Sequence, residues 1–301
     1  MIRALRPQEW VKNLLVFAGL LFSGRLDQGP QVLDALLTFV AFCAIASAGY
    51  LFNDLRDRDL DRRHPEKRHR PIASGALSPG IAGGVAVLLA LGAAGLGFVV
   101  EPEIAALVGV YALVTAAYSL FLKRIVILDV MTIASLFILR VVAGAVAVEA
   151  QASEYLLVCT AMLALFLGFT KRRQEAILEG PAPDPPSPTL APGAPAEPAS
   201  PAATRPVLEH YSLPFLDQMV AMVTAAAILS YVIYAVNSPL VGSKMLATAP
   251  SVLYGVFRYL YLIYDRRDTR STAAILSEDP GMMLAGVSWV ASAILALYVF
   301  D

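Results

Sequence analysis

Three aspartates at fixed spacing are the residues of this sequence most suited to chemistry. They lie in the stretch NDLRDRDLD at residues 53–61, which follows an apolar run without a turn signal. A helix that continues through this stretch places Asp54, Asp57 and Asp61 on one face, because their spacings are three and four residues. Like charges repel there unless Mg²⁺ lies between them, and Mg²⁺ prefers a few carboxylates plus phosphate oxygens. The pattern predicts catalytic aspartates in a Mg²⁺–diphosphate site, with a solvated, salt-bridged helix end as the alternative.

A basic loop follows the aspartates and is placed to reach back over them. Residues 64–72 read HPEKRHRPI, and Arg and Lys both bind phosphate oxygens. Further Lys and Arg residues lie where other apolar runs end, although the preference of membrane proteins for basic residues on the cytoplasmic side predicts some of these by itself. The predicted metal ligands are Asn53, Asp54, Asp57 and Asp61. The predicted substrate-binding residues are Lys12, Asn13, Asn53, Lys67, Arg68, Arg70, Tyr118, Lys123, Arg124, Asp129, Arg140, Lys171, Arg172 and Tyr211.

Three ionisable residues lie inside apolar runs, where a charge is costly unless it faces a polar cavity or a partner. They are Asp129, Arg140 and Arg258. Asp129 and Arg140 are eleven residues apart, which is three helical turns on the same face. Two interpretations remain open: these side chains line a substrate cavity together with Tyr211, or they form structural ion pairs between helices.

The composition indicates what must position these residues. The chain has 301 residues, of which 57% are hydrophobic and 16% are charged, and its mean hydropathy is +0.65. Soluble domains average roughly 45–50% apolar and about 25% charged residues, so we expect an all-α, polytopic membrane protein. Cys43 and Cys159 lie in apolar runs, which excludes a secreted disulfide framework, and no cleavable signal peptide is expected. Nine membrane spans are predicted, near 11–24, 32–52, 81–100, 104–122, 125–148, 155–170, 215–236, 245–264 and 282–300.

The basic residues predict the orientation of these spans. With the N-terminus inside, 19 of the 23 Lys and Arg residues fall on the cytoplasmic side, which is a strong positive-inside bias. The aspartates then lie on the cytoplasmic face, and the helices are expected to enclose a cavity open to that side. Residues 1–301 are expected to form one transmembrane domain. Residues 180–206 hold 10 of the 20 prolines and predict a flexible cytoplasmic loop, read either as a partner-binding segment or as a tolerated insertion.

These motifs resemble those of the UbiA superfamily of intramembrane prenyltransferases. The resemblance rests on N-D-x-x-D-x-x-x-D at residues 53–61, on R-P-I at 70–72 and on Y-S-x-x-x-K-R at 118–124, and it covers the chain apart from the proline-rich loop. Finer features are similar to the decaprenyl-phosphate phosphoribosyltransferase branch. They are R-P-x-x-W-x-K-N at 6–13, H-P-x-K-R-x-R-P at 64–71, Leu122-Lys123 with Asp129, and F-R-Y-L-Y at 257–261.

The resemblance implies a Mg²⁺-dependent transfer of 5-phosphoribose from 5-phosphoribosyl 1-diphosphate to a polyprenyl phosphate. It also implies a multi-pass protein of the bacterial inner membrane that supplies cell-wall arabinan precursors. No nucleic-acid partner is expected, and a homo-oligomer is compatible with the sequence. One alternative is an aromatic prenyltransferase using a prenyl diphosphate, but a second aspartate motif, D-x-x-x-D, is not found because Ile133 follows Asp129 at that spacing. Another is a transporter, although its charges should cross the membrane rather than gather on one face.

Overall fold

The computed structural model describes residues 1–64, 67–179, 206–238, 240, 242–268, 270 and 272–298, and within these ranges every regular element is a helix. Eight helical segments among the described residues are long and apolar enough to cross a membrane. Seven of them are single α-helices: α3 (Gly29–Arg56), α5 (Pro79–Val100), α6 (Pro102–Leu120), α7 (Leu128–Ala147), α8 (Glu154–Glu179), α9 (Leu213–Val236) and α12 (Pro280–Tyr298). The eighth joins the 3₁₀ helix η5 (Gly242–Thr248) to α10 (Ala249–Tyr264). The prediction of an all-α, multi-pass membrane protein is confirmed.

The first predicted span, 11–24, is not one continuous α-helix. The 3₁₀ helix η1 (Pro7–Val16) has 10 residues, and α2 (Phe17–Phe22) adds 6. With rises of about 2.0 and 1.5 Å per residue, the pair extends roughly 29 Å, close to the ~30 Å hydrocarbon thickness of a bilayer. The two pieces together are long enough to cross, but this segment is not among the eight span-length helices found in the described residues, so the first of the nine predicted spans is not confirmed.

The remaining short elements connect these long helices. They are α1 (Ile2–Leu5), α4 (Arg58–Arg63), η2 (Lys67–His69), η3 (Leu122–Arg124), η4 (Pro206–His210) and α11 (Thr272–Glu278). The long helices begin where the sequence gives a start signal. Proline occupies one of the first two positions of α3, α5, α6, α9 and α10, where its missing N–H is not needed. Ser78 and Ser212 cap α5 and α9 by accepting from the Ile81 and Phe215 N–H groups.

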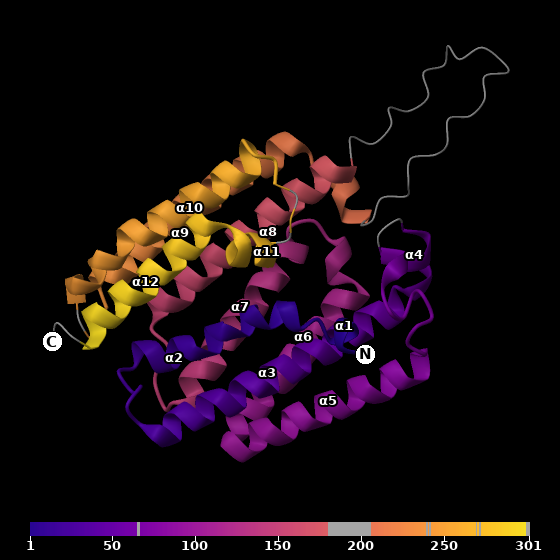
Figure 1. Ribbon diagram of the computed structural model, residues 1–301, viewed down its shortest axis with the longest axis horizontal. Helices are drawn as coiled ribbons and strands as arrows, with labels where there is room; N and C mark the ends of the chain where they lie inside the picture. The colour runs from indigo at the N-terminus through magenta and orange to yellow at the C-terminus, as the bar shows by residue number, and fades with distance from the viewer. Residues whose placement is uncertain are drawn as a thin grey trace, which may run out of the picture.

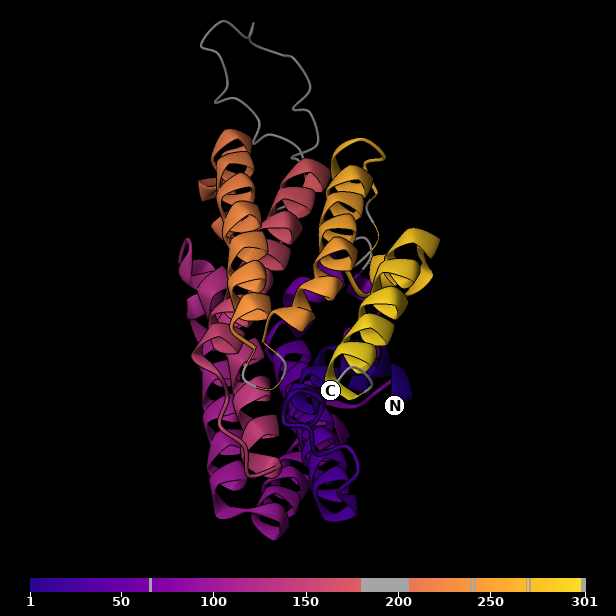
Figure 2. The same cartoon turned by 90° about the vertical axis from the view of Figure 1, so that its left-hand side faces the viewer.

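The long helices lie roughly side by side and are inclined to the long axis of the molecule (Figures 1 and 2). One apolar core lies among α3, α5, α6 and α7 and contains Phe42, Ile104 and Val108. A second core joins α7 and α8 to α9, α10 and α11 and contains Phe166 and Leu216. Helix α7 contributes to both, so it connects the two halves of the bundle.

The segment formed by η1 and α2, the entry segment, packs closely on α7 because a glycine lies on each side of the crossing: Gly19 on α2 and Gly144 on α7. A Cβ at Gly144 would overlap the Val16 carbonyl oxygen, and one at Gly19 would overlap the backbone of Gly144. Small residues let helices approach closely where lipid offers no hydrophobic driving force between them. Of the proline-rich segment at 180–206, only Pro206 lies among the described residues.

Candidate active site

The aspartate motif lies at the junction of α3 and α4, at the right-hand end of the molecule in Figure 1. The prediction of one continuous helix is wrong here. Helix α3 ends at Arg56, Asp57 leaves helical geometry with φ −89° and ψ 6°, and α4 begins at Arg58. Because the helix breaks at the middle aspartate, the three carboxylates do not share one partner.

Asp54 and Asp61 share the guanidinium of Arg70. Arg70 Nη1 lies 3.1 Å from Asp54 Oδ1 and 2.8 Å from Asp61 Oδ2. Asp54 also accepts from Arg6 Nη2 at 2.6 Å. Both carboxylates are buried, whereas the side chains of Arg6 and Arg70 keep 23% and 27% of their surface exposed. Burial raises the pKa of Asp61 and the nearby Asp54 charge adds to this, while Arg70 acts in the opposite direction.

Asp57 has a different cation, supplied by the connection between α6 and α7. Lys123 Nζ lies 2.8 and 2.7 Å from the two carboxylate oxygens of Asp57, and 3.4 Å from Asn53 Oδ1. The predicted residues Asn53, Asp57 and Lys123 therefore meet, although 66 positions separate Lys123 from Asp57.

The other predicted phosphate contacts lie on η2, η3, α8 and η1. Lys67 and Arg68 form η2 immediately before Arg70, and the Arg124 side chain is exposed beside Lys123. Lys171 is exposed on α8. Lys12 forms an ion pair with Glu9 on η1.

Asp129, Arg172 and Tyr211 form a second cluster that is sealed from solvent. Arg172 Nε lies 2.7 Å from Asp129 Oδ2, and the two side chains are 1% and 0% exposed. Arg172 also pairs with Glu175, and its Nη2 lies 3.4 Å from the Tyr118 hydroxyl. The interpretation of Asp129 as part of an ion pair between helices is confirmed, with its partner on α8.

Tyr211, the residue that follows η4, completes this cluster. Its hydroxyl donates to Asp129 Oδ1 at 2.7 Å and accepts from the Ile127 N–H at 2.7 Å. Burial, together with the hydrogen bond to Asp129, raises the pKa of the Tyr211 phenol well above its usual range. The phenol is therefore neutral at physiological pH and serves as a donor.

Arg140 is not joined to Asp129 despite their shared helical face. Its Nε donates to Asn13 Oδ1 at 2.6 Å, and its Nη2 donates to the Tyr111 hydroxyl at 2.6 Å. Asn13 and Arg140 are both buried. This network connects η1, α6 and α7 in the interior of the bundle.

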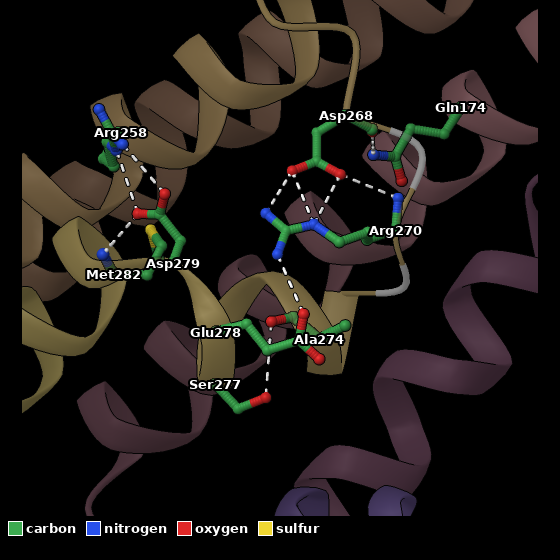
Figure 3. Close-up of polar contacts among 9 residues, drawn as sticks. All are labelled: Gln174, Arg258, Asp268, Arg270, Ala274, Ser277, Glu278, Asp279 and Met282. Carbon is green, nitrogen blue, oxygen red and sulfur yellow. Dashed lines mark hydrogen bonds and ion pairs between the residues drawn. The ribbon is translucent and has the colours of Figure 1, made fainter.

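Helix α10 and the segment that joins it to α12 carry their own ion pairs, shown in Figure 3. Arg258, the third intramembrane charge, binds Asp279 through contacts of 3.1 and 3.0 Å. Arg270 joins Asp268 at 2.6 Å to Glu278 at 3.1 Å. The Arg270 guanidinium lowers the pKa of Asp268. An ion pair is thus the role of Arg258, as the structural alternative predicted.

The donors of the aspartate motif are suited to Mg²⁺, which the family resemblance implies. Among the residues that the structure describes, no three His, Cys, Asp or Glu side chains converge as a ready metal cage. Mg²⁺ does not require one, because it takes one or two carboxylates and fills its other positions with phosphate oxygens and water. Asp54 and Asp61 both approach one nitrogen of Arg70, so their oxygens already surround a single cationic position. The oxygen-only set fits a phosphate-bound Mg²⁺ ion.

Sequence reasoning did not select Arg6 as a site residue. Its contact with Asp54 spans 48 positions, so no local spacing predicts it. The available signal was the Arg6-Pro7 pair at the head of the motif at residues 6–13.

Comparison with known proteins assigns the chain to a family. A model of the UbiA prenyltransferase family matches residues 14–174. The chain is 31% identical to the decaprenyl-phosphate phosphoribosyltransferase of Corynebacterium glutamicum, across 99% of this chain and 87% of that protein. The chain belongs to the UbiA prenyltransferase family. A protein of the same name from Mycolicibacterium smegmatis is 38% identical, but that match spans 58% of this chain and 56% of the relative.

The fold of this UbiA family member agrees with a solved structure. A UbiA homolog from Archaeoglobus fulgidus, bound to GPP and Mg²⁺, superposes with a TM-score of 0.73 over 99% of both chains. Sequence identity in that comparison is 16%, so the likeness establishes the fold. The predicted UbiA-like architecture is confirmed.

Proposed function

We propose that this protein transfers 5-phosphoribose from 5-phosphoribosyl 1-diphosphate to a polyprenyl phosphate in the membrane, releasing diphosphate. The observation that carries the proposal is the cluster in which Arg6, Arg70 and Lys123 meet the carboxylates of the aspartate motif. Two phosphorylated substrates bring more negative charge than one prenyl diphosphate and a neutral aromatic acceptor, and this cluster offers cations for them. The relative in Corynebacterium, matched over nearly the whole chain, is named for this activity with decaprenyl phosphate.

Asn53, Asp54, Asp57 and Asp61 would hold Mg²⁺ on the diphosphate. When bound, the ion supplies neutralisation of the charge that develops on the leaving diphosphate. Arg70 and Lys123 are partly exposed, so each can exchange its carboxylate for a phosphate oxygen when substrate binds. Lys12, Lys67, Arg68, Arg124 and Lys171 are proposed as further phosphate contacts.

The reaction forms one bond and breaks one bond at the anomeric carbon. An oxygen of the lipid phosphate attacks that carbon, and the bond to the diphosphate breaks with its electron pair leaving on the diphosphate. The nucleophile is already an anion, so no side chain has to remove a proton. Attack opposite the leaving group inverts the centre and gives a β-linked polyprenylphosphoryl-5-phosphoribose, a precursor for cell-wall arabinan.

The proposed setting is the inner membrane of a bacterium, with the N-terminus and the aspartate motif on the cytoplasmic side. The positive-inside bias supports this orientation. The chain is proposed to act as one transmembrane domain, with residues 180–206 as an inserted cytoplasmic loop. The polyprenyl tail would extend sideways into the bilayer, where apolar helix faces cover it without polar contacts.

A transfer assay tests the proposal. Purified protein in nanodiscs is given Mg²⁺, a polyprenyl phosphate and phosphoribosyl diphosphate labelled in the ribose, and label is followed into the lipid extract. We expect transfer that stops with EDTA and resumes with added Mg²⁺. Absence of transfer, together with turnover of a prenyl diphosphate onto an aromatic acid, would replace this function with aromatic prenyl transfer.

A further inference from the structure

The connection between α6 and α7 contains a strained turn at Ile127. This residue has φ 69° and ψ −46°, and the Leu128 N–H donates across it to the Val126 carbonyl at 2.8 Å. The geometry is that of a γ-turn with positive φ, which is rare and strained. For a β-branched side chain such a φ is a genuine outlier, and such outliers persist only where their surroundings hold them.

The Tyr211 hydroxyl is the group that holds this turn. It accepts from the Ile127 N–H at 2.7 Å and donates to Asp129 Oδ1 at 2.7 Å. Asp129 is in turn fixed by Arg172 on α8. The Tyr211 side chain is buried, and its hydroxyl uses its only proton and one lone pair in these two bonds. It is therefore occupied as a clamp rather than available to a substrate.

The clamped turn lies four residues after the lysine that meets the aspartate motif. Ile125 N–H donates to the Leu122 carbonyl of η3 at 3.1 Å, and the Ile125 carbonyl accepts from the Asp129 N–H across the turn at 3.0 Å, so Ile125 bonds on both sides. Lys123 projects from η3 to both carboxylate oxygens of Asp57. A change in the backbone at Ile127 is therefore expected to move the Lys123 amine.

We propose that Tyr211 is a positioning residue whose hydroxyl holds the strained turn at Ile127 and so fixes Lys123 opposite Asp57. The effect on substrate rests on the proposed function, in which Lys123 contacts the diphosphate. The clamp itself does not depend on which substrate binds. The two parts can therefore be tested separately.

Hydrogen exchange tests the clamp without any substrate. Tyr211→Phe removes only the hydroxyl and keeps the ring that stacks on Phe215 with centroids 6.0 Å apart. The matched control is Tyr231→Phe in α9, which removes a buried hydroxyl bonded to Thr248 of η5 and Trp289 of α12. We expect faster amide exchange in residues 121–128 for Tyr211→Phe and unchanged exchange there for Tyr231→Phe. Unchanged exchange in both variants, or equal acceleration in both, would overturn the clamp.

A double-mutant cycle tests whether the clamp acts through Lys123. The readout is the Kd of labelled phosphoribosyl diphosphate in the presence of Mg²⁺. We expect Tyr211→Phe to weaken binding about tenfold, the scale of one misplaced charge-assisted hydrogen bond. In a Lys123→Ala background the same substitution should change Kd by less than about twofold, because the two residues act as a unit.

The cycle also separates the two ways in which the account can fail. A full tenfold loss from Tyr211→Phe in the Lys123→Ala background would overturn action through Lys123. If the wild-type protein neither binds nor transfers phosphoribose, the proposed function fails. In that case the exchange experiment still decides the clamp.

Discussion

The aspartate motif and the Asp129 cluster use the same side-chain types but differ in exposure to water. In the motif, buried Asp54 is paired with arginines whose side chains keep about a quarter of their surface exposed. In the cluster, Asp129 and Arg172 are 0% and 1% exposed. A partly exposed cation can exchange a carboxylate for a phosphate at small cost, whereas a fully buried pair is expensive to separate. The difference assigns chemistry to the first group and support to the second.

The largest effect on activity should follow from removing the charge of the middle aspartate of the motif. Asp57→Asn keeps the size of the side chain but removes the carboxylate that pairs with Lys123 and is assigned to Mg²⁺. We expect the loss of measurable phosphoribosyl transfer, with membrane insertion and thermal stability close to those of the wild type. Transfer at a substantial fraction of the wild-type rate would remove the metal assignment.

Breaking an ion pair in the Asp129 cluster should instead lower the stability of the protein. Asp129→Asn removes one of the two carboxylates paired with the buried Arg172 guanidinium and leaves Glu175, so we expect a loss of about 3 kcal/mol in unfolding free energy, at the lower end of the range for breaking a buried pair. Thermal unfolding in detergent measures it. The matched control is Asp217→Asn. The Asp217 side chain, which pairs with Arg173, is 45% exposed, so its loss should cost about 1 kcal/mol or less in unfolding free energy. Equal losses in both variants would contradict the distinction.

Removing the Arg70 side chain, which contacts the aspartate motif, should weaken substrate binding. Arg70→Ala removes a cation shared by Asp54 and Asp61 and proposed to contact phosphate, so we expect KM for phosphoribosyl diphosphate to rise about 10- to 100-fold. The control is Arg63→Ala, an exposed residue of α4. Initial-rate kinetics measure both variants, and an unchanged KM for Arg70→Ala would exclude the contact.

Asp61 provides the smallest and most specific test. Its pKa is raised by burial, so its charged form opposes folding at neutral pH, and this cost disappears as pH falls through the folded-state pKa. Asp61→Asn should therefore raise Tm modestly at pH 7, and the gain should shrink toward acidic pH. A pH series of thermal unfolding curves measures this. A lower Tm at pH 7 would show that Arg70 outweighs burial.

Much of the fold could be predicted because span length and charge asymmetry are local properties of the sequence. The run at 213–236 is mostly apolar and begins at a serine cap, so α9 matches the predicted span at 215–236 closely. The entry segment deviates because its residues adopt 3₁₀ geometry before α2. Hydropathy does not distinguish these two helix types.

The site was only partly predictable because spacing describes one helix at a time. It selected the three aspartates, but it did not reveal the break at Asp57. It placed Asp129 and Arg140 on one face, whereas Asp129 binds Arg172 on another helix. Which helix ends meet is decided by packing between distant segments, and a single sequence does not encode that as a local pattern.

The most direct measurement is equilibrium binding of labelled phosphoribosyl diphosphate to the protein in nanodiscs, with and without Mg²⁺. We expect Mg²⁺-dependent binding that is lost in Asp57→Asn and retained in Asp217→Asn, whose carboxylate lies outside both the aspartate motif and the Asp129 cluster. Undiminished binding in Asp57→Asn would contradict the assignment of the donor to the aspartate motif.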